Sequence, residues 1–315
     1  MKIQKITLPT PFYIGPINTY LIEDDPLTII DTGPKTEEAL ASLRLQLLRR
    51  GHRLEDIKRI IITHTHEDHY GLANTIRRAS GAEVYIHSWE ARRLTSPDDY
   101  HIQRRFMQRA GVPPEIIEAF EAGYRMVISK YADAIPEVKP LNDDEEMVFS
   151  TGSLRVIHTP GHTPGSICLF RESNRLLLTA DTVLKRITPN PVMNADPFDQ
   201  TRRFQSLSEY LCSLARLRNL APTHAMTGHG EDITDYEELF NRMLKKTRER
   251  QLSLLSLLPK QGATAWEMAE RMFPDAEGVH LFLALSEASA NLDLAVADGK
   301  ARVEQRMEME VFFPA

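Results

Sequence analysis

The chain has 315 residues, of which 42% are hydrophobic and 26% are charged, and its formal net charge is −6. This composition is typical of a folded globular protein and excludes a disordered or fibrous chain. The acidic balance argues against a nucleic-acid surface, and two cysteines are too few for a disulfide framework. The apolar runs are well short of the about 20 residues that a membrane helix needs. We therefore expect a cytoplasmic protein.

The first part of the chain predicts alternating strands and helices. We expect strands at residues 3–8, 17–21, 27–30, 57–63 and 83–87, and helices at 36–50 and 70–79. The run at 57–63 is continuously apolar, as in strands that are buried on both faces. The strand–helix–strand order favours an α/β class. Residues 89–140 change character and predict a helical insertion over the sheet.

The second part returns to strands and then loses the alternation. We expect strands at 147–149, 154–158, 166–171, 175–180 and 223–227, and a helix at 202–217. Beyond residue 236 we expect three helices, the second opened by a capping box at Thr264 and Glu267, and a terminal pair of strands. We therefore predict a main domain at 1–236 and a small winged-helix-like domain at 237–315.

A dense cluster of histidines carries the chemistry. Residues 63–69 read THTHEDH, and this string follows the predicted strand at 57–63. In an extended chain, alternate residues face one way, so His64 and His66 can share one metal with Asp68 near them. His69 then points elsewhere, and Asp68 and His69 can serve a second ion. The alternative, a helix-capping Asp68 beside solvated histidines, does not account for four potential ligands in six residues.

Three further candidates follow strands. His162 comes after the strand at 154–158, Asp181 directly after the one at 175–180, and His229 after the one at 223–227. The carboxyl ends of strands in open α/β sheets are where ligands bind, so we expect these side chains at one edge. Neighbouring glycines and prolines let the backbone turn sharply there.

Taken together, these motifs resemble the metallo-β-lactamase-fold hydrolases, in their glyoxalase-II-like dinuclear branch. The resemblance rests on Asp31-Thr32-Gly33, the string from His64 to His69, His162, Asp181 and His229, and covers about residues 1–235. It implies a four-layer αβ/βα sandwich with two metals at one edge. The C-terminal part resembles the winged-helix appendage of relatives of the β-lactamase-like protein 2 type.

The resemblance also implies a role for each site residue. His64, His66 and His162 would bind the first metal, and Asp68, His69 and His229 the second, with Asp181 bridging the two. Asp31 would hold the ligands in place rather than bind. Ala180 departs from the family, where glycine is frequent before the bridging aspartate, and we expect little from that change.

Nitrogen and oxygen ligands without cysteine suit zinc, with iron and manganese as alternatives. Two divalent ions that share an oxygen can supply hydroxide near neutral pH. We expect this bridging hydroxide to attack the substrate, with Asp68 as ligand and proton acceptor. The insertion and the proline-rich loop at 188–192 are candidate pocket walls, and Lys185 and Arg186 read as a solvated pair or as contacts for an anionic substrate.

Three functions remain open. The first is a hydrolase of a small ester-like bond, either a thioester or a lactone. The second is a phosphodiesterase or endoribonuclease, although the residues from Asn241 onward hold about as many acidic as basic side chains, so that a nucleic-acid partner is not favoured. The third gives the C-terminal domain a role in partner binding or homodimer formation.

Overall fold

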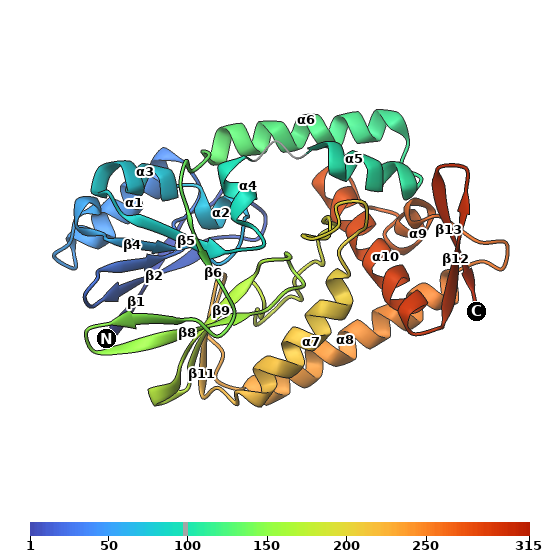
Figure 1. Cartoon of the computed structure of the whole chain (residues 1–315). Coiled ribbons are helices and arrows are strands. Elements are labelled where there is room, and N and C mark those ends of the chain that lie inside the picture. Colours follow the sequence, from blue (N-terminus) through green and yellow to red (C-terminus); the bar gives the residue numbers. More distant parts are fainter. Residues whose placement is uncertain (97–99) are drawn as a thin grey trace.

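Two β-sheets face each other in the computed structural model, which describes residues 1–96 and 100–315 (Figure 1). The first sheet has the order β1 (Lys2–Leu8), β2 (Ile17–Glu23), β3 (Thr28–Ile30), β4 (Arg59–Ile61), β5 (Glu83–His87) and β6 (Lys139–Leu141). The second has the order β11 (His224–Thr227), β10 (Leu176–Ala180), β9 (Ile167–Arg171), β8 (Gly152–His158) and β7 (Glu146–Phe149). The strands from β3 to β6 run parallel, as do β10 and β11.

Neighbouring residues of one strand enter different cores, and this alternation builds the layers. Ile29 and Ile60 pack outward with α1 (Glu37–Leu48) and α3 (Ala73–Ser80), whereas Ile30 and Ile61 pack between the two sheets. In the second sheet, the even and odd residues of β9 likewise divide between the inner core and a core with α7 (Ser206–Asn219) and α8 (Tyr236–Leu257). The expected α/β class and four-layer αβ/βα sandwich are confirmed.

The predicted insertion contains α4 (Ala91–Thr95), α5 (Tyr100–Arg109) and α6 (Pro114–Tyr131). Pro114 is the first residue of α6, a position where its missing N–H costs nothing. The insertion does not end in a loop, because residues 139–141 form β6 at the edge of the first sheet. The chain also makes short 3-10 turns at Leu54–Asp56 and Glu172–Asn174.

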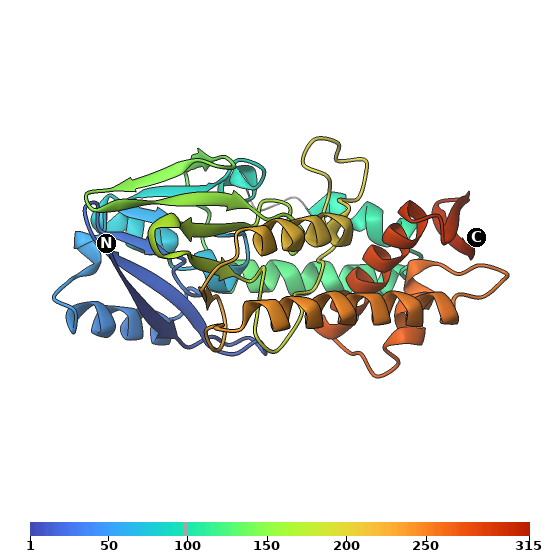
Figure 2. The same ribbon diagram turned by 90° about the horizontal axis from the view of Figure 1, so that it is seen from below.

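The C-terminal elements are α9 (Ala265–Met272), α10 (Val279–Ala297), β12 (Ala301–Arg306) and β13 (Met309–Pro314). The capping box predicted at Thr264 and Glu267 opens α9. One apolar core joins these elements to the insertion, since Phe106, Met107 and Ile117 pack with residues of α8, α9 and α10. Figure 2 shows α8 running beside α7 and on toward the C-terminal end.

The boundary predicted at residue 236 coincides with the start of α8. Tyr236, Leu239 and Phe240 pack on the second sheet, while Leu254 of the same helix belongs to the C-terminal core. A single helix therefore bridges the two predicted domains, and the division at 236 stays a prediction.

Helix α10 is longer and more apolar than the sequence led us to expect of any segment of this chain. Among the described residues it is the helix long and apolar enough to cross a bilayer, at 19 residues, although most of it is buried within the protein. Helices in the core of a protein meet the same criteria of length and composition.

Candidate metal centre

All seven predicted ligand residues lie together at one edge of the sandwich. They follow β4, β8, β10 and β11, and their side chains form three overlapping groups whose ligand atoms lie within 4.8 Å of one another. The groups are His64, His66 and His162; Asp68, His69 and His229; and His64, His69 and Asp181. The structure thus brings together the residues that the sequence points to, and their role as ligands stays a prediction.

The first group is a tight triangle of imidazole nitrogens. His66 Nδ1 lies 3.0 Å from His64 Nε2 and 3.0 Å from His162 Nε2. His64 Nδ1 is directed at Thr63 Oγ1 and His162 Nδ1 donates to the carbonyl of Asn190, so their Nε2 atoms are left with lone pairs. Three converging nitrogens of this kind match a divalent cation.

The second group lies around a pair of carboxylates. His229 Nε2 is 3.2 Å from Asp68 Oδ2 and 3.6 Å from Asp181 Oδ2. His69 Nε2 is 3.5 Å from Asp181 Oδ1, and His162 Nε2 is 4.0 Å from Asp181 Oδ2. Asp181 therefore lies between the two groups and reaches histidines of both.

The extended conformation expected for Asp68 and His69 is wrong. Asp68 and His69 do not continue an extended chain, because α2 (Glu67–Tyr70) begins directly after His66. The predicted helix at 70–79 is in fact two helices, α2 and α3. The helical turn is what places Asp68 and His69 side by side with His229. Gly71 ends it where a Cβ would lie 2.3 Å from the carbonyl oxygen of Tyr131.

Two of the candidate ligands, His69 and His229, are held by groups outside the cluster. Asp31 Oδ2 accepts from His69 Nδ1 at 2.8 Å, and the same carboxylate accepts from both the amide and the hydroxyl of Thr63. His229 Nδ1 donates to the carbonyl of Pro16 at 3.0 Å. These contacts fix the ring tautomers so that each Nε2 faces the centre. Asp31 therefore contacts His69 from outside the three groups, and its supporting role stays a prediction.

Two small residues matter for the backbone at Asp181. A Cβ on Gly228 would lie 2.3 Å from Asp181 Oδ1, so only glycine fits beside that carboxylate. Ala180 has φ 44°, in the left-handed region where a side chain costs on the order of 1 kcal/mol. The departure from glycine at residue 180 therefore has a cost that the sequence argument did not foresee.

Burial and charge divide the site into two halves. Burial is the largest influence on His64 and His66 and lowers both pKa values well below normal, so these rings stay neutral. Burial also acts against charge on His69 and His229, but the carboxylates, Asp181 foremost, outweigh it and raise both pKa values. In turn, burial is opposed at Asp181 by His229 and His69, which hold the pKa of the carboxyl well below its usual range.

Buried polar atoms without partners indicate that the cluster fits metal ions. His69 Nε2, Asp181 Oδ1 and His229 Nε2 are buried and have no hydrogen-bond partner among the residues that the structure describes. Leaving such atoms unpaired costs about 1–3 kcal/mol each, more where they are charged. All three face the same centre, and divalent cations at that centre would satisfy them together.

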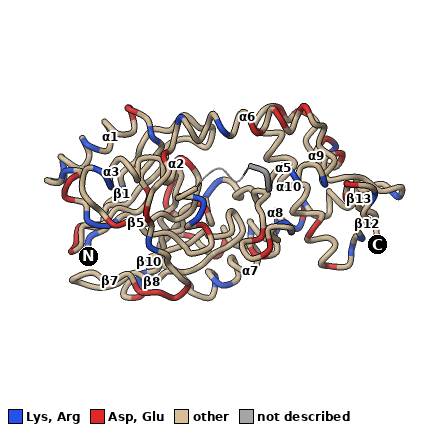
Figure 3. Tube along the Cα trace, turned by 45° about the horizontal axis from the view of Figure 1, so that its top comes forward, with Lys and Arg blue, Asp and Glu red and all other residues tan. Residues whose placement is uncertain are grey.

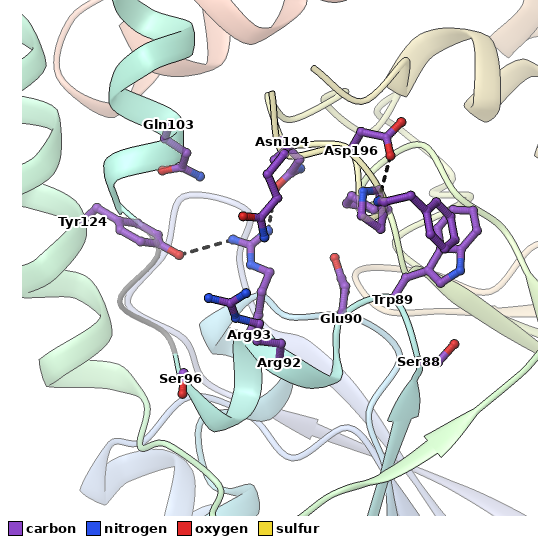
Figure 4. Close-up of a pocket in the computed structure, with 15 residues that line it drawn as sticks. Ser88, Trp89, Glu90, Arg92, Arg93, Ser96, Gln103, Tyr124, Asn194 and Asp196 are labelled. Carbon is purple, nitrogen blue, oxygen red and sulfur yellow. Dashed lines mark hydrogen bonds between the residues drawn. The ribbon is translucent and has the colours of Figure 1, made fainter. Parts of the chain in front are cut away.

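Figure 4 shows a pocket of about 410 Å³ whose wall is bonded to the histidine string. Its walls come from the insertion and from the segment before α7, and they include Trp89, Glu90, Arg93, Asn194 and Phe198. Pro164, two residues after His162, also lines it. Glu90 Oε2 accepts from the amide of Thr65, between His64 and His66, so the pocket wall and the ligand string are bonded to each other.

These pocket residues were missed by the sequence argument. The insertion was expected to supply a wall and does so, but the other wall is formed by residues 194–198 rather than by the predicted 188–192. Arg93 Nη1 donates to Asn194 Oδ1 at 2.5 Å and Nη2 donates to the hydroxyl of Tyr124 at 3.3 Å, contacts visible in Figure 4. In the sequence, Glu90 looks like an ordinary helix-end glutamate. What distinguishes it in the structure is its burial, at 1% exposure.

Lys185 and Arg186 do not line the pocket. Both pair with Glu231 on the surface, Lys185 Nζ at 2.6 Å and Arg186 Nη2 at 2.5 Å. The predicted solvated surface pair fits this placement, and the ion pairs with Glu231 are an addition to it.

A histidine pair beside the pocket predicts acid sensitivity. His87 is buried, stacks on His158 with ring centroids 3.8 Å apart, and accepts at Nδ1 from the amide of Trp89. Burial, with a smaller contribution from His158 and against that of Asp143, lowers the pKa of His87 to about 3. In the unfolded chain this histidine takes up a proton near pH 6.5, whereas in the folded chain it does so only near pH 3. Its contribution to the free energy of unfolding is therefore complete above pH 6.5 and falls toward pH 3, by about 1.4 kcal/mol per pH unit.

We therefore expect His87→Phe to flatten the fall of unfolding free energy between pH 6.5 and pH 4. Urea titrations of the metal-free protein at several pH values measure this slope. His52→Phe, at a half-buried position outside the site, is the matched control. An unchanged slope in His87→Phe would contradict the assignment.

The comparisons with known proteins agree with this geometry. The family model described as the metallo-beta-lactamase superfamily matches residues 13–229. The Bacillus subtilis protein named Probable metallo-hydrolase YqjP is 32% identical over 297 residues, which are 93% of this chain and 92% of the relative. The Caenorhabditis elegans Beta-lactamase-like protein 2 homolog is 22% identical over 294 residues, 92% of this chain and 82% of the relative. The crystal structure of the metallo-beta-lactamase family protein TTHA1429 from Thermus thermophilus has a TM-score of 0.84 and 27% identity, and the match covers 99% of this chain and 98% of that one.

Proposed function

The chain belongs to the metallo-beta-lactamase superfamily and is a metal-dependent hydrolase, and from this premise we propose that it holds two divalent ions and hydrolyses a small thioester or lactone. The observation that carries the proposal is the set of unpaired atoms at His69, Asp181 and His229 beside a pocket of about 410 Å³. We infer zinc as the metal, with iron and manganese as alternatives, because the candidate ligands are imidazoles and carboxylates without a thiolate.

We assign residues to each ion according to the three groups of converging ligand atoms described above. His64, His66 and His162 would hold one ion, and Asp68, His69 and His229 the other, with Asp181 shared. When bound, the ions supply Lewis-acid activation of a water and of the bond under attack. The chain supplies orientation through Asp31, Asn190 and Pro16, which keep the Nδ1–H of His69, His162 and His229 turned away from the centre.

Asp68 is the proton acceptor in this proposal. His69 and His229 oppose the effect of burial and lower the pKa of Asp68, so its carboxylate is ionised at neutral pH. It can take a proton from the attacking water as the new carbon–oxygen bond forms. The same proton then passes to the departing thiolate or alkoxide as the acyl bond breaks, so that a thioester gives an acid and a thiol, and a lactone gives a single hydroxy acid.

The pocket favours a small substrate. A volume of about 410 Å³ lies within the range of small-molecule sites, roughly 300–1,000 Å³. The rings of Trp89 and Phe198 meet edge to face with centroids 4.9 Å apart and offer an apolar surface at its rim. Lys and Arg are interspersed with Asp and Glu over the C-terminal elements, unlike the single-sign surface typical of a nucleic-acid module (Figure 3).

Helices α8, α9 and α10 and the hairpin of β12 and β13 are proposed to form a winged-helix-like unit, with homodimer formation as their alternative role. We also propose that the protein is cytoplasmic, which accords with two free thiols, at Cys168 and Cys212.

The test combines metal analysis with a substrate panel. The purified full-length protein, loaded with zinc, iron or manganese, is assayed against thioesters, lactones, phosphodiesters and RNA. We expect turnover of a thioester or lactone. Cleavage confined to RNA or phosphodiesters would replace the proposal with the nuclease alternative, and no turnover by the fully metallated protein on any substrate would contradict it.

A further inference from the structure

We infer that Asn190 is a positioning residue that ties the candidate ligand His162 to the C-terminal helix α10. This inference rests on the proposed function, because it concerns the same metal centre. It assigns to the C-terminal part of the chain a share in building that centre, in addition to any role in assembly.

The link consists of two hydrogen bonds through one residue. His162 Nδ1 donates to the backbone carbonyl of Asn190 at 2.8 Å, and Asn190 Nδ2 donates to the carbonyl of Leu283 in α10 at 2.9 Å. Three residues later, the amide of Met193 donates to the hydroxyl of Ser286, which is completely buried in α10. Residues 190–193 are therefore fastened to one face of α10.

The segment needs such fastening because it has little regular structure of its own. Residues 184–205 form neither a helix nor a named strand, and a loop of this length in a folded domain depends on contacts with neighbouring elements. The carbonyl of Asn190 also accepts from the amide of Val192, which makes a local turn but does not attach the turn to the rest of the protein. The side chain of Asn190 makes that attachment next to His162, and the bond from Met193 to Ser286 adds a second one.

His162 differs in this respect from the other supported ligands. His69 is held by Asp31, directly after β3, and His229 by Pro16, directly before β2, so both take their support from the first sheet. The support of His162 reaches instead to α10, more than ninety residues along the chain from Asn190. Loss of the Asn190 side chain should therefore loosen the first group, His64, His66 and His162, and leave the second group in place.

The test uses Asn190→Ala and Asn190→Asp in the full chain. Both keep the backbone carbonyl but lose the donor to Leu283, and Asn190→Asp also keeps the volume of the side chain. We expect each to weaken zinc binding at one of two sites by about 10–100-fold, the range for groups that support a ligand. Competition with a chromophoric chelator measures both affinities, and Asn174→Ala, at an exposed turn, is the matched control.

A second measurement tests the hydrogen bond between His162 and Asn190 without bound metal and without an activity assay. Long-range ¹H–¹⁵N spectra of the metal-free wild-type protein, with His162 assigned by His162→Gln, should show one fixed Nδ1–H tautomer for that ring. Asn190→Asp should shift or average that signal while the signal of His229 stays unchanged.

The outcomes separate this inference from the proposed function. A wild-type protein that binds no divalent ion would overturn the proposed function. The inference alone would be overturned by either of two results. The first is a wild-type protein that binds zinc at two sites, with both Asn190 variants binding at the wild-type affinities. The second is a tautomer-averaged His162 ring in the wild-type protein. If Asn190→Ala does not fold, the volume-conserving Asn190→Asp and the wild-type spectrum still decide it.

Discussion

Asp181→Asn is expected to cost more metal affinity and activity than the roughly 10–100-fold typical of a residue that only supports a ligand. Asp181 approaches His69 at 3.5 Å through Oδ1 and His229 at 3.6 Å through Oδ2, and His162 lies 4.0 Å away. Asparagine has nearly the same shape, so the backbone beside Gly228 need not move. It removes the negative charge between the two groups and turns an N–H toward nitrogens that should face a cation.

The experiment compares metal per chain, measured by mass spectrometry after dialysis, with turnover of the best substrate of the panel. Asp56→Asn makes the same chemical change at an exposed position distant from the cluster and should retain both values. Full metal content together with full activity in Asp181→Asn would refute the shared position of Asp181.

Asp31→Asn is expected to lower metal affinity by about 10–100-fold and, because one buried donor loses its acceptor, to cost about 1–3 kcal/mol of unfolding free energy. The carboxylate of Asp31 accepts from His69 and twice from Thr63, and asparagine cannot accept in all of these directions. Asp31 also has φ 55°, a left-handed conformation that asparagine tolerates well. The substitution therefore removes charge and acceptors while keeping the backbone preference.

Asp31→Ala separates the two contributions. It should show the same metal defect and, in addition, lose on the order of 1 kcal/mol of unfolding free energy, because alanine is strained at that φ. Chelator competition gives the affinities, and urea titration of the metal-free proteins gives the stabilities. If Asp31→Asn binds metal as tightly as the wild-type protein, Asp31 does not support His69 in the way its contacts suggest.

The strands and the ligand string could be predicted because both depend on local pattern. A continuous apolar run indicated β4, and polar residues in the loops that follow strands indicated Asp181 and His229. Helix α2 could not be predicted in this way, since its four residues are too few to show a helical period. Its position depends instead on tight packing at Gly71, where the backbones of Tyr131 and Lys35 approach.

The pocket and the supporting contacts depend on pairs of residues far apart in the chain. Arg93 meets Asn194 and Glu90 meets Thr65, and Asn190 reaches Leu283. Apart from Thr65, none of these residues stands in a motif, because each contact is fixed by how the insertion and α10 pack against the sandwich. Sequence spacing could locate the candidate ligands, but only tertiary packing could show what holds and surrounds them.

The apolar core that the insertion shares with the C-terminal helices limits how this protein can be recombined with its relatives. Phe106, Met107 and Ile117 of the insertion contact the same core as Leu254, Trp266 and Leu285. A chimera that takes residues 100–135 from one parent and residues 241–315 from another would join two unmatched halves of one interior. Exchange of pocket specificity between relatives should therefore succeed only when both segments are grafted from the same parent.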